Sequence, residues 1–276
     1  MKRAILPFLA ILKLTYCFIS VLIYSANASE LNSSKHLTIF TEPSLSVAMT
    51  KIARQYSKQY NVVTSISFNS PYNLIGDIDM GEAADVFITA NDDVIESLKL
   101  KGLVDIYNIV EIGQDSLNLV TSNENNKIPP ILYNNDNNLL NSLKILNSKK
   151  VTLILDNYSS SSGKIGGELI KKLNLNDFKL FTKITEDRSP ITASITNNNN
   201  YYSLLLTSQI YNNNNIKIIA TSDAISDAIS DAISDDIVAR YKILIIAGNN
   251  MNVARQFLNF IKSNEAKKIL KDNGID

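Results

Sequence analysis

The sequence predicts an α/β protein with a mainly parallel β-sheet, built in two halves. Three observations predict this fold class. Apolar strand-like runs alternate with amphipathic helix-like segments from residue 37 onward. An Asn-rich stretch at 122–150 interrupts the alternation, which resumes at residue 151. Strand-to-helix junctions in both halves place a hydroxyl group before the helix.

The first half repeats a strand followed by a helix. In its longest helix-like segment, Val47, Ile52 and Tyr56 recur at helical spacing. Gly102 closes the last of these helices. The predicted strands are residues 37–40, 62–68, 84–89 and 117–121, and the predicted helices are residues 44–60, 71–80 and 92–101.

The second half is less regular because low-complexity segments interrupt it. Asparagine runs occupy 197–200 and 212–215, and residues 222–237 repeat SDAI and end in SDDI. We interpret the repeat as a lengthened surface loop without a calcium role, since it lacks the Gly and terminal Glu of an EF-hand loop. Residues 202–206 fit a strand or a buried helix. The predicted strands are 151–155, 180–184, 216–220 and 241–247; the predicted helices are 163–173, one starting at 189–190, 253–264 and a shorter one ending at 271.

The N-terminal segment, residues 1–28, differs from the rest of the chain. A basic start precedes a long apolar stretch that ends in Ala-Asn-Ala at 26–28, which is typical of a secretory signal peptide cut after its last residue. The alternative is an uncleaved membrane anchor, because residues 5–24 are nearly long enough to span a bilayer. Cleavage would remove Cys17, the only cysteine, and with it any thiol or disulfide chemistry.

The composition argues against several function classes. The 27 basic and 27 acidic residues give a formal net charge of zero without a basic stripe, which argues against nucleic-acid binding. The one histidine, His36, lies just before the first predicted strand, which argues against a Ser-His-Asp triad. GxSxG and GxGxxG motifs are absent from the sequence. We therefore expect neither an enzyme nor a cofactor or metal site, and we expect a monomer.

The hydroxyl-bearing junctions predict a site for a small anion. Ser44 and Ser70 precede helices in the first half, and Ser162 and Arg188 lie at such junctions in the second. Helix N-termini offer free N–H groups and a positive dipole end, and in parallel sheets these junctions share the edge where ligands bind. For any single serine, including Ser44, helix capping is the more usual role of the hydroxyl. Junctions in both halves together predict a cleft that binds an oxyanion through neutral donors.

Three segments carry a more specific resemblance. They read LTIFTEPSLSVAMTKIARQYSKQY, ISFNSPYNLIGDIDMGEAADVFITAND and IGQDSLNLV. They resemble the periplasmic molybdate-binding proteins of ABC transporters. The resemblance implies a two-lobed periplasmic binding protein fold of type II whose chain crosses twice between the lobes. It implies that lobe one is 30–114 plus 246–276 and that lobe two is 115–245.

The resemblance also implies a function and part of a ligand set. The protein would capture molybdate, tungstate or a related oxyanion in the periplasm and deliver it to an inner-membrane permease with its ATPase. The first ligand, a serine hydroxyl, falls on Ser44, and two backbone amides fall on Ser162 and near Arg188. Glu42, where the family has a small residue, would repel an anion if it faced the cleft. Arg188 would either offset that charge or be a solvated surface residue.

Two of the five implied contacts are damaged in this sequence. One falls on Pro71, beside which Ser70 has a hydroxyl, and the other, a tyrosine hydroxyl, falls on Leu206. The residues near Leu206 that could replace it are Tyr201, Tyr202 and Thr207. The absence of two hydrogen bonds to a charged ligand would weaken binding by about a hundredfold or more. The alternative is therefore a degenerate or repurposed fold with weak or no oxyanion binding that acts only as a docking protein.

Overall fold

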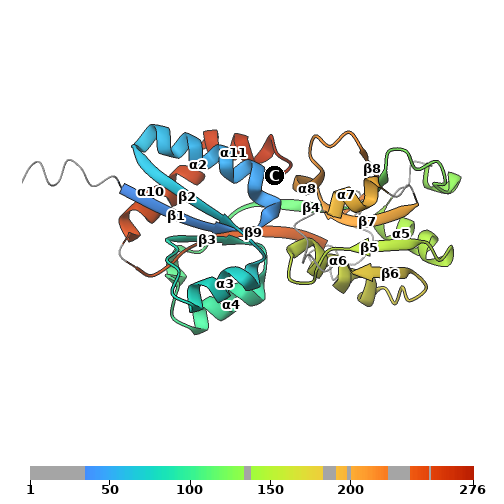
Figure 1. Ribbon diagram of the computed structural model, residues 1–276, viewed down its shortest axis with the longest axis horizontal. Coiled ribbons are helices and arrows are strands. Elements are labelled where there is room, and N and C mark those ends of the chain that lie inside the picture. The colour runs from blue at the N-terminus through green and yellow to red at the C-terminus, as the bar shows by residue number, and fades with distance from the viewer. Residues whose placement is uncertain (1–34, 134–137, 183–190, 198–199, 223–236, 249) are drawn as a thin grey trace, which may run out of the picture.

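The computed structural model describes residues 35–133, 138–182, 191–197, 200–222, 237–248 and 250–276. Two α/β lobes lie side by side and are joined through strands β4 (Val110–Ser122) and β9 (Val238–Ile245) (Figure 1). The predicted signal peptide, Arg188 and nearly all of the SDAI repeat lie outside the described residues. Within the described ranges, no helix reaches the length and apolarity that a membrane span requires.

The first lobe is a parallel sheet between two layers of helices (Figure 1). Its strands are β1 (Lys35–Thr41), β2 (Val62–Phe68) and β3 (Val86–Thr89). Its helices are α2 (Ser46–Tyr60), α3 (Pro71–Asp79), α4 (Asp92–Leu100), α10 (Met251–Ile261) and α11 (Asn264–Lys271), with short 3-10 turns η1 (Pro43–Leu45) and η2 (Ile106–Asn108). Because side chains alternate along a strand, Leu37 and Ile39 of β1 pack with α2 and α10, and Phe40 packs with α3 and α4.

The second lobe repeats this layered plan around a shorter sheet. Its strands are β5 (Thr152–Leu155), β6 (Lys179–Thr182), β7 (Tyr201–Leu206) and β8 (Ile216–Thr221). Its helices are α5 (Leu139–Ser148), α6 (Ser161–Lys172), α7 (Ile191–Thr196) and α8 (Thr207–Ile210), with the 3-10 turn η3 (Pro130–Tyr133). Strand β5 pairs in parallel with β6 and β7. Leu153 packs with α5 and α6, whereas Ile154 packs with α7 on the other face.

One sheet runs through both lobes in the order β2-β1-β3-β9-β4-β7-β5-β6, with β8 also paired to β4. The first part of β4 pairs with β9, and its second part pairs with β7 and β8. All pairings of β4 and β9 are antiparallel, so the sheet is mixed, with parallel strands inside each lobe. A continuous apolar cluster follows these strands, so the lobes share part of their core at the joint.

Most predicted elements are present in the described residues, one open alternative is decided, and two differences have physical reasons. The segment 202–206 is a strand. Strand β4 begins at Val110, seven residues before the predicted start at 117. The sequence did not indicate this first part, because it mixes exposed and buried residues and has no apolar run. Helix α5 lies in the Asn-rich stretch where no helix was predicted. Its buried face is formed by leucines at 139, 143 and 146, which recur at helical spacing among the asparagines.

Candidate functional site

Polar groups gather where the strands of both lobes end. In the first lobe β1 leads into η1 and β3 leads into α4, and in the second lobe β5 leads into α6 and β7 into α8. The turn η1 packs against α8, so these ends meet across the joint. Ligands of α/β sheets bind beyond the carboxyl ends of the strands. The junction between the lobes is therefore the candidate site.

Ser44 lies in η1, and its hydroxyl accepts a hydrogen bond from the Tyr241 hydroxyl of β9 at 2.8 Å. The prediction that Ser44 caps the following helix is wrong. The turn η1 separates the strand from α2, whose N-cap residue is Leu45, and no side chain makes a capping hydrogen bond there. Pro43, which has no N–H, fits the first position of this turn because an N–H there would be unpaired in any case. The Ser44 hydroxyl therefore serves a contact between η1 and the strand that joins the lobes.

Ser70 is the N-cap residue of α3. Its hydroxyl accepts a hydrogen bond from the Asn73 N–H at 3.3 Å, and Pro71 follows as the first helical residue. Among the contacts of the described residues, none joins Ser70 to Ser44 or to Ser162. The Ser70 hydroxyl is thus engaged in helix capping. It is the nearest substitute for the hydrogen-bond donor that Pro71 does not provide.

The N-terminus of α6 is the main polar feature that the second lobe brings to the junction. Ser160 caps the helix by accepting a hydrogen bond from the Gly163 N–H at 3.1 Å. Ser162 is buried, and its hydroxyl donates to Asp156 at 3.0 Å. The Ser162 side chain therefore stabilises the loop that precedes the helix. The backbone N–H of Ser162 is the group that the resemblance implies as a contact to the anion.

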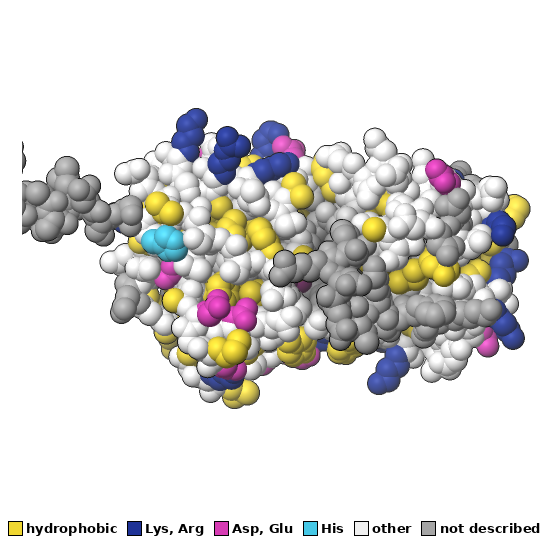
Figure 2. Space-filling view, in the orientation of Figure 1, with side chains coloured by type: hydrophobic (Ala, Val, Ile, Leu, Met, Phe, Trp, Pro, Cys, Tyr) yellow, Lys and Arg dark blue, Asp and Glu magenta, His cyan; other side chains and the backbone are white. Residues whose placement is uncertain are grey.

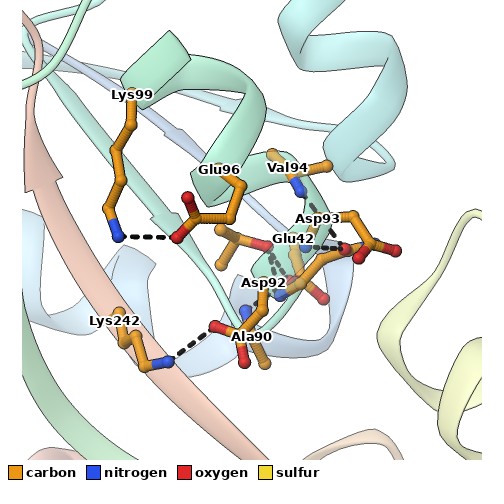
Figure 3. A network of polar contacts seen from close by, with 10 residues as sticks. Glu42, Ala90, Asp92, Asp93, Val94, Glu96, Lys99 and Lys242 are labelled. Atoms are coloured by element: carbon orange, nitrogen blue, oxygen red, sulfur yellow. Dashed lines mark hydrogen bonds and ion pairs between the residues drawn. The ribbon is translucent and has the colours of Figure 1, made fainter.

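Glu42 lies at the centre of the contact between the lobes. Its side chain is buried, and one carboxylate oxygen accepts hydrogen bonds from the Thr89 hydroxyl at 2.5 Å and the Ala90 N–H at 2.7 Å (Figure 3). The hydroxyl and N–H of Ser161, at the start of α6, lie close enough to lower the pKa of Glu42, although the hydroxyl has no partner at full hydrogen-bond geometry. Burial is the larger influence and raises that pKa above its ordinary value.

A second carboxyl group, Asp115 of β4, is buried at the same joint. The Ser208 N–H, at the start of α8, donates to both carboxylate oxygens of Asp115, and each N···O distance is 3.3 Å. Burial raises the pKa of Asp115 to about 7, and hydrogen bonds from Ser208 and Thr207 oppose the rise. Burial, and then the charges of Asp115 and Glu42, raise the pKa of Tyr241 well above its ordinary value. Two carboxyl groups and a tyrosine hydroxyl thus share one polar region inside the molecule.

Thr207 and Leu206 lie beside this region, at the end of β7. The Thr207 hydroxyl accepts a hydrogen bond from the Asn118 amide at 2.9 Å and donates to the Ser116 carbonyl at 3.3 Å. Leu206 is fully buried in the core, and its N–H donates to Gln209. The Thr207 hydroxyl therefore holds β4 against α8.

Tyr201 and Tyr202 begin β7, at its opposite end from Leu206. Tyr202 lines a cavity of about 240 Å³ at the amino ends of β5 and β7, away from the junction. The residues lining this cavity are Asn125, Lys127, Lys150, Val151, Thr152, Asn200 and Tyr202. Strand β7 therefore holds Tyr202 away from the position where a tyrosine could replace Leu206.

An ion pair makes a further contact between the lobes. The Lys164 ammonium of α6 lies 2.5 Å from a carboxylate oxygen of Asp93, at the start of α4. Lys164 is mostly covered, and Asp93 is largely exposed. This pair lies at the rim, and the buried groups around Glu42 lie inside.

Four residues of the junction were not predicted as functional: Asp115, Ser161, Ser208 and Tyr241. Asp115 had a signal in the sequence, because a charged residue adjoins a strand that is otherwise buried. Ser161 lies in the serine run at 159–162, but spacing alone does not tell which serine faces the other lobe. Ser208 and Tyr241 had no local signal, since their roles depend on how the lobes meet.

Two α/β lobes whose polar strand ends meet across two linking strands define a bilobal ligand-binding protein. The chain belongs to the family of bacterial extracellular solute-binding proteins, whose family model matches residues 37–276. A comparison with curated protein sequences finds no match.

Solved structures share the fold along nearly the whole chain. A protein described as the substrate-binding domain of a molybdenum ABC transporter from Clostridium difficile is 24% identical with a TM-score of 0.64, over 88% of this chain and 99% of that one. The tungstate ABC transporter structure from Geobacter sulfurreducens is 16% identical with a TM-score of 0.65, over 87% and 100% of the two chains. The Azotobacter vinelandii periplasmic molybdate-binding protein is 16% identical with a TM-score of 0.63, over 87% and 98%. At these identities the likeness establishes the fold.

Proposed function

We propose that this solute-binding protein captures a small oxyanion between its lobes and delivers it to an ABC transporter permease in the inner membrane. The observation that carries the proposal is the meeting of neutral donors from both lobes. Ser44 and Tyr241 lie on one side, and the N-termini of α6 and α8, with Ser161 and Ser208, lie on the other. Hydroxyl and N–H donors at a helix N-terminus suit a dehydrated anion.

The names of the structural neighbours support the same class of ligand. They are described as binding or transporting molybdenum, molybdate or tungstate. For this chain we further propose export by the signal peptide, a monomer in the periplasm, and lobes at 30–114 plus 246–276 and at 115–245. The position of β4 supports the first boundary, because its first part pairs with β9 and its second part pairs with β7 and β8 of the second lobe.

Titration calorimetry on the mature chain tests the proposal. Molybdate, tungstate, sulfate and phosphate are each added at about neutral pH and at about pH 5.5, near the ordinary range of carboxyl pKa values. We expect saturable one-to-one binding of at least one of them. The absence of heat from all four at millimolar concentration, under both conditions, would refute oxyanion capture.

The second candidate is a degenerate protein that only docks on a membrane partner. Two observations favour it: Leu206 offers no polar side chain, and Ser70 is engaged in capping. This candidate predicts no change in the radius of gyration when an oxyanion is added. A measured decrease, which reports closure of the lobes, would exclude it.

A further inference from the structure

The position of Glu42 bears on which oxyanion the site accepts. The Glu42 carboxylate lies among donors that an anion would use, namely Thr89 and Ala90 from the first lobe and Ser161 from the second. Glu42 is 1% exposed and Ser161 is 3% exposed, so both side chains are buried where the lobes meet. Any anion that reaches the start of α6 therefore approaches a carboxyl group of the protein.

The Ser161 hydroxyl adjoins the Glu42 carboxylate but completes no hydrogen bond at full geometry, so it remains a donor for a ligand oxygen. It is a buried donor at the first residue of α6, a helix of 12 residues. Buried hydroxyls normally have partners, and leaving one unpaired costs about 1–3 kcal/mol. A ligand oxygen at the start of α6 would satisfy this hydroxyl and would adjoin Glu42.

No cation among the described residues is placed to neutralise Glu42. The titratable groups on the surrounding elements are two ion pairs and three single groups. The pairs are Asp93–Lys164 and Asp92–Lys242, of which Figure 3 shows the second. The single groups are Asp115, Asp156 and Tyr241. Each lysine is already paired with an aspartate, and neither contributes to the pKa of Glu42. A dianion beside a charged Glu42 would therefore meet a like charge in a buried region, where repulsion is strong.

We propose that Glu42 makes oxyanion binding depend on one proton shared between its carboxyl group and the ligand, an inference that rests on the proposed function. An oxyanion with its own O–H group supplies that proton and donates it in a hydrogen bond to the Glu42 carboxylate. A fully deprotonated dianion binds only when Glu42 itself is protonated and donates. The site thereby selects inorganic phosphate, which keeps one O–H group above neutral pH, over sulfate, molybdate and tungstate.

Sulfate and inorganic phosphate are the probes for this proposal, because sulfate stays a dianion throughout the pH range and hydrogen phosphate keeps a proton. The variants are Glu42→Gln, whose amide donates as a protonated Glu42 would, and Glu82→Gln, a matched change at an exposed carboxylate. Calorimetry from about pH 5.5 to about pH 8 gives the affinities. Buffers with different heats of ionisation give the protons taken up per ligand.

Above the pKa of the Glu42 carboxyl group, the wild type is expected to take up one proton per sulfate and to bind sulfate about tenfold more weakly for each further pH unit. At about pH 8 it should bind phosphate at least about tenfold more tightly than sulfate. In Glu42→Gln, sulfate binding should lose its proton uptake and its pH dependence, and the preference for phosphate should disappear. Glu82→Gln should behave as the wild type.

Other results would overturn the inference in distinguishable ways. If the wild type binds sulfate without proton uptake, or if Glu42→Gln keeps the uptake, the shared proton does not belong to Glu42. If Asp115→Asn, and not Glu42→Gln, abolishes the uptake, the proton belongs to Asp115. If neither the wild type nor Glu42→Gln binds either anion, the inference fails, and titration with molybdate and tungstate then decides the proposed function separately. The wild-type measurement decides whether a proton is taken up even if Glu42→Gln does not fold.

Discussion

Asp115 shows how a single buried carboxyl group can make stability depend on pH. Because its folded pKa of about 7 lies above its ordinary value of 3.8, the folded state holds a proton that the unfolded state has lost between these values. The stability that this proton gives to the folded state is therefore complete below about pH 4, and it is lost as pH rises to about 7. We predict that the unfolding free energy of the wild type, relative to Asp115→Asn, falls by roughly 4 kcal/mol across that window.

Urea unfolding at several pH values measures this difference. Glu82→Gln, which removes an exposed carboxylate, is the control and should follow the wild type. A difference between wild type and Asp115→Asn that stays constant with pH, or that grows as pH rises, would contradict a raised pKa at Asp115.

Tyr241 connects the joint to Ser44 through one hydroxyl. Tyr241→Phe removes the donor but leaves Ser44 partly exposed, so water can take the place of the tyrosine hydroxyl. We predict a decrease of about 1 kcal/mol in unfolding free energy, the usual net worth of one hydrogen bond. Tyr107→Phe at a side chain that is 91% exposed should change nothing measurable. Equal effects of the two variants would remove any special role of the Tyr241 hydroxyl.

The sequence predicted which strand ends are polar, but not the partner of each side chain. Ser70 and Ser44 both precede a helix, yet Ser70 caps α3 and Ser44 contacts Tyr241. The difference comes from the turn η1, which displaces the start of α2 by two residues from Ser44 to Ser46. Spacing could suggest that Glu42 faces an anion site, but its burial and its contact with Ser161 depend on how the lobes are placed.

At the scale of elements, the start of α6 depends on close packing at Gly163. A Cβ added there would lie 2.1 Å from the carbonyl oxygen of Asn157, which cannot move without disturbing the loop that leads into the helix. Gly167 lies one turn further along the same helix and has room, with Tyr158 atoms at 3.7 Å or more. We predict that Gly163→Ala destabilises the protein by at least about 2 kcal/mol, as overpacking does.

The matched variant Gly167→Ala should stabilise it by about 0.5–1 kcal/mol, because alanine favours the helix. Thermal unfolding of both variants, read by circular dichroism, measures the pair. If Gly163→Ala is as stable as the wild type, the loop before α6 is not fixed as described. In that case the orientation of Ser161 and Ser162 would not be fixed either.

Helices and strands with a regular apolar pattern were predictable, and those that mix patterns were not. Strands β1, β2 and β3 have apolar runs, so local sequence indicates them. The first part of β4 is stabilised by pairing with β9, which is distant in sequence. Such a partner is invisible to a local pattern.

At the scale of the whole molecule, few contacts among the described residues hold the lobes against each other away from the linking strands. The Asp93–Lys164 ion pair is one of them, and it crosses from α4 to α6. Figure 2 shows Lys and Arg side chains on the outer surfaces of both lobes. Since Asp93 is largely exposed, the pair is worth at most about 1 kcal/mol. That amount barely affects global unfolding, but it shifts an equilibrium between closed and open lobes by about fivefold.

We therefore predict that Lys164→Ala raises the radius of gyration of the ligand-free protein in low salt, while its unfolding free energy changes by less than about 1 kcal/mol. Small-angle X-ray scattering measures the first quantity and urea unfolding the second. Lys99→Ala is the control, because the Lys99–Glu96 pair lies within α4 and does not bridge the lobes. Adding salt to about 1 M, where charges are screened within about 3 Å, should bring the wild type close to the variant. Asp93→Ala removes the same ion pair, so combining it with Lys164→Ala should open the lobes no further than either variant alone. If the two variants have additive effects, the pair does not control the arrangement of the lobes. The same conclusion follows if the radius of gyration is unchanged in every variant.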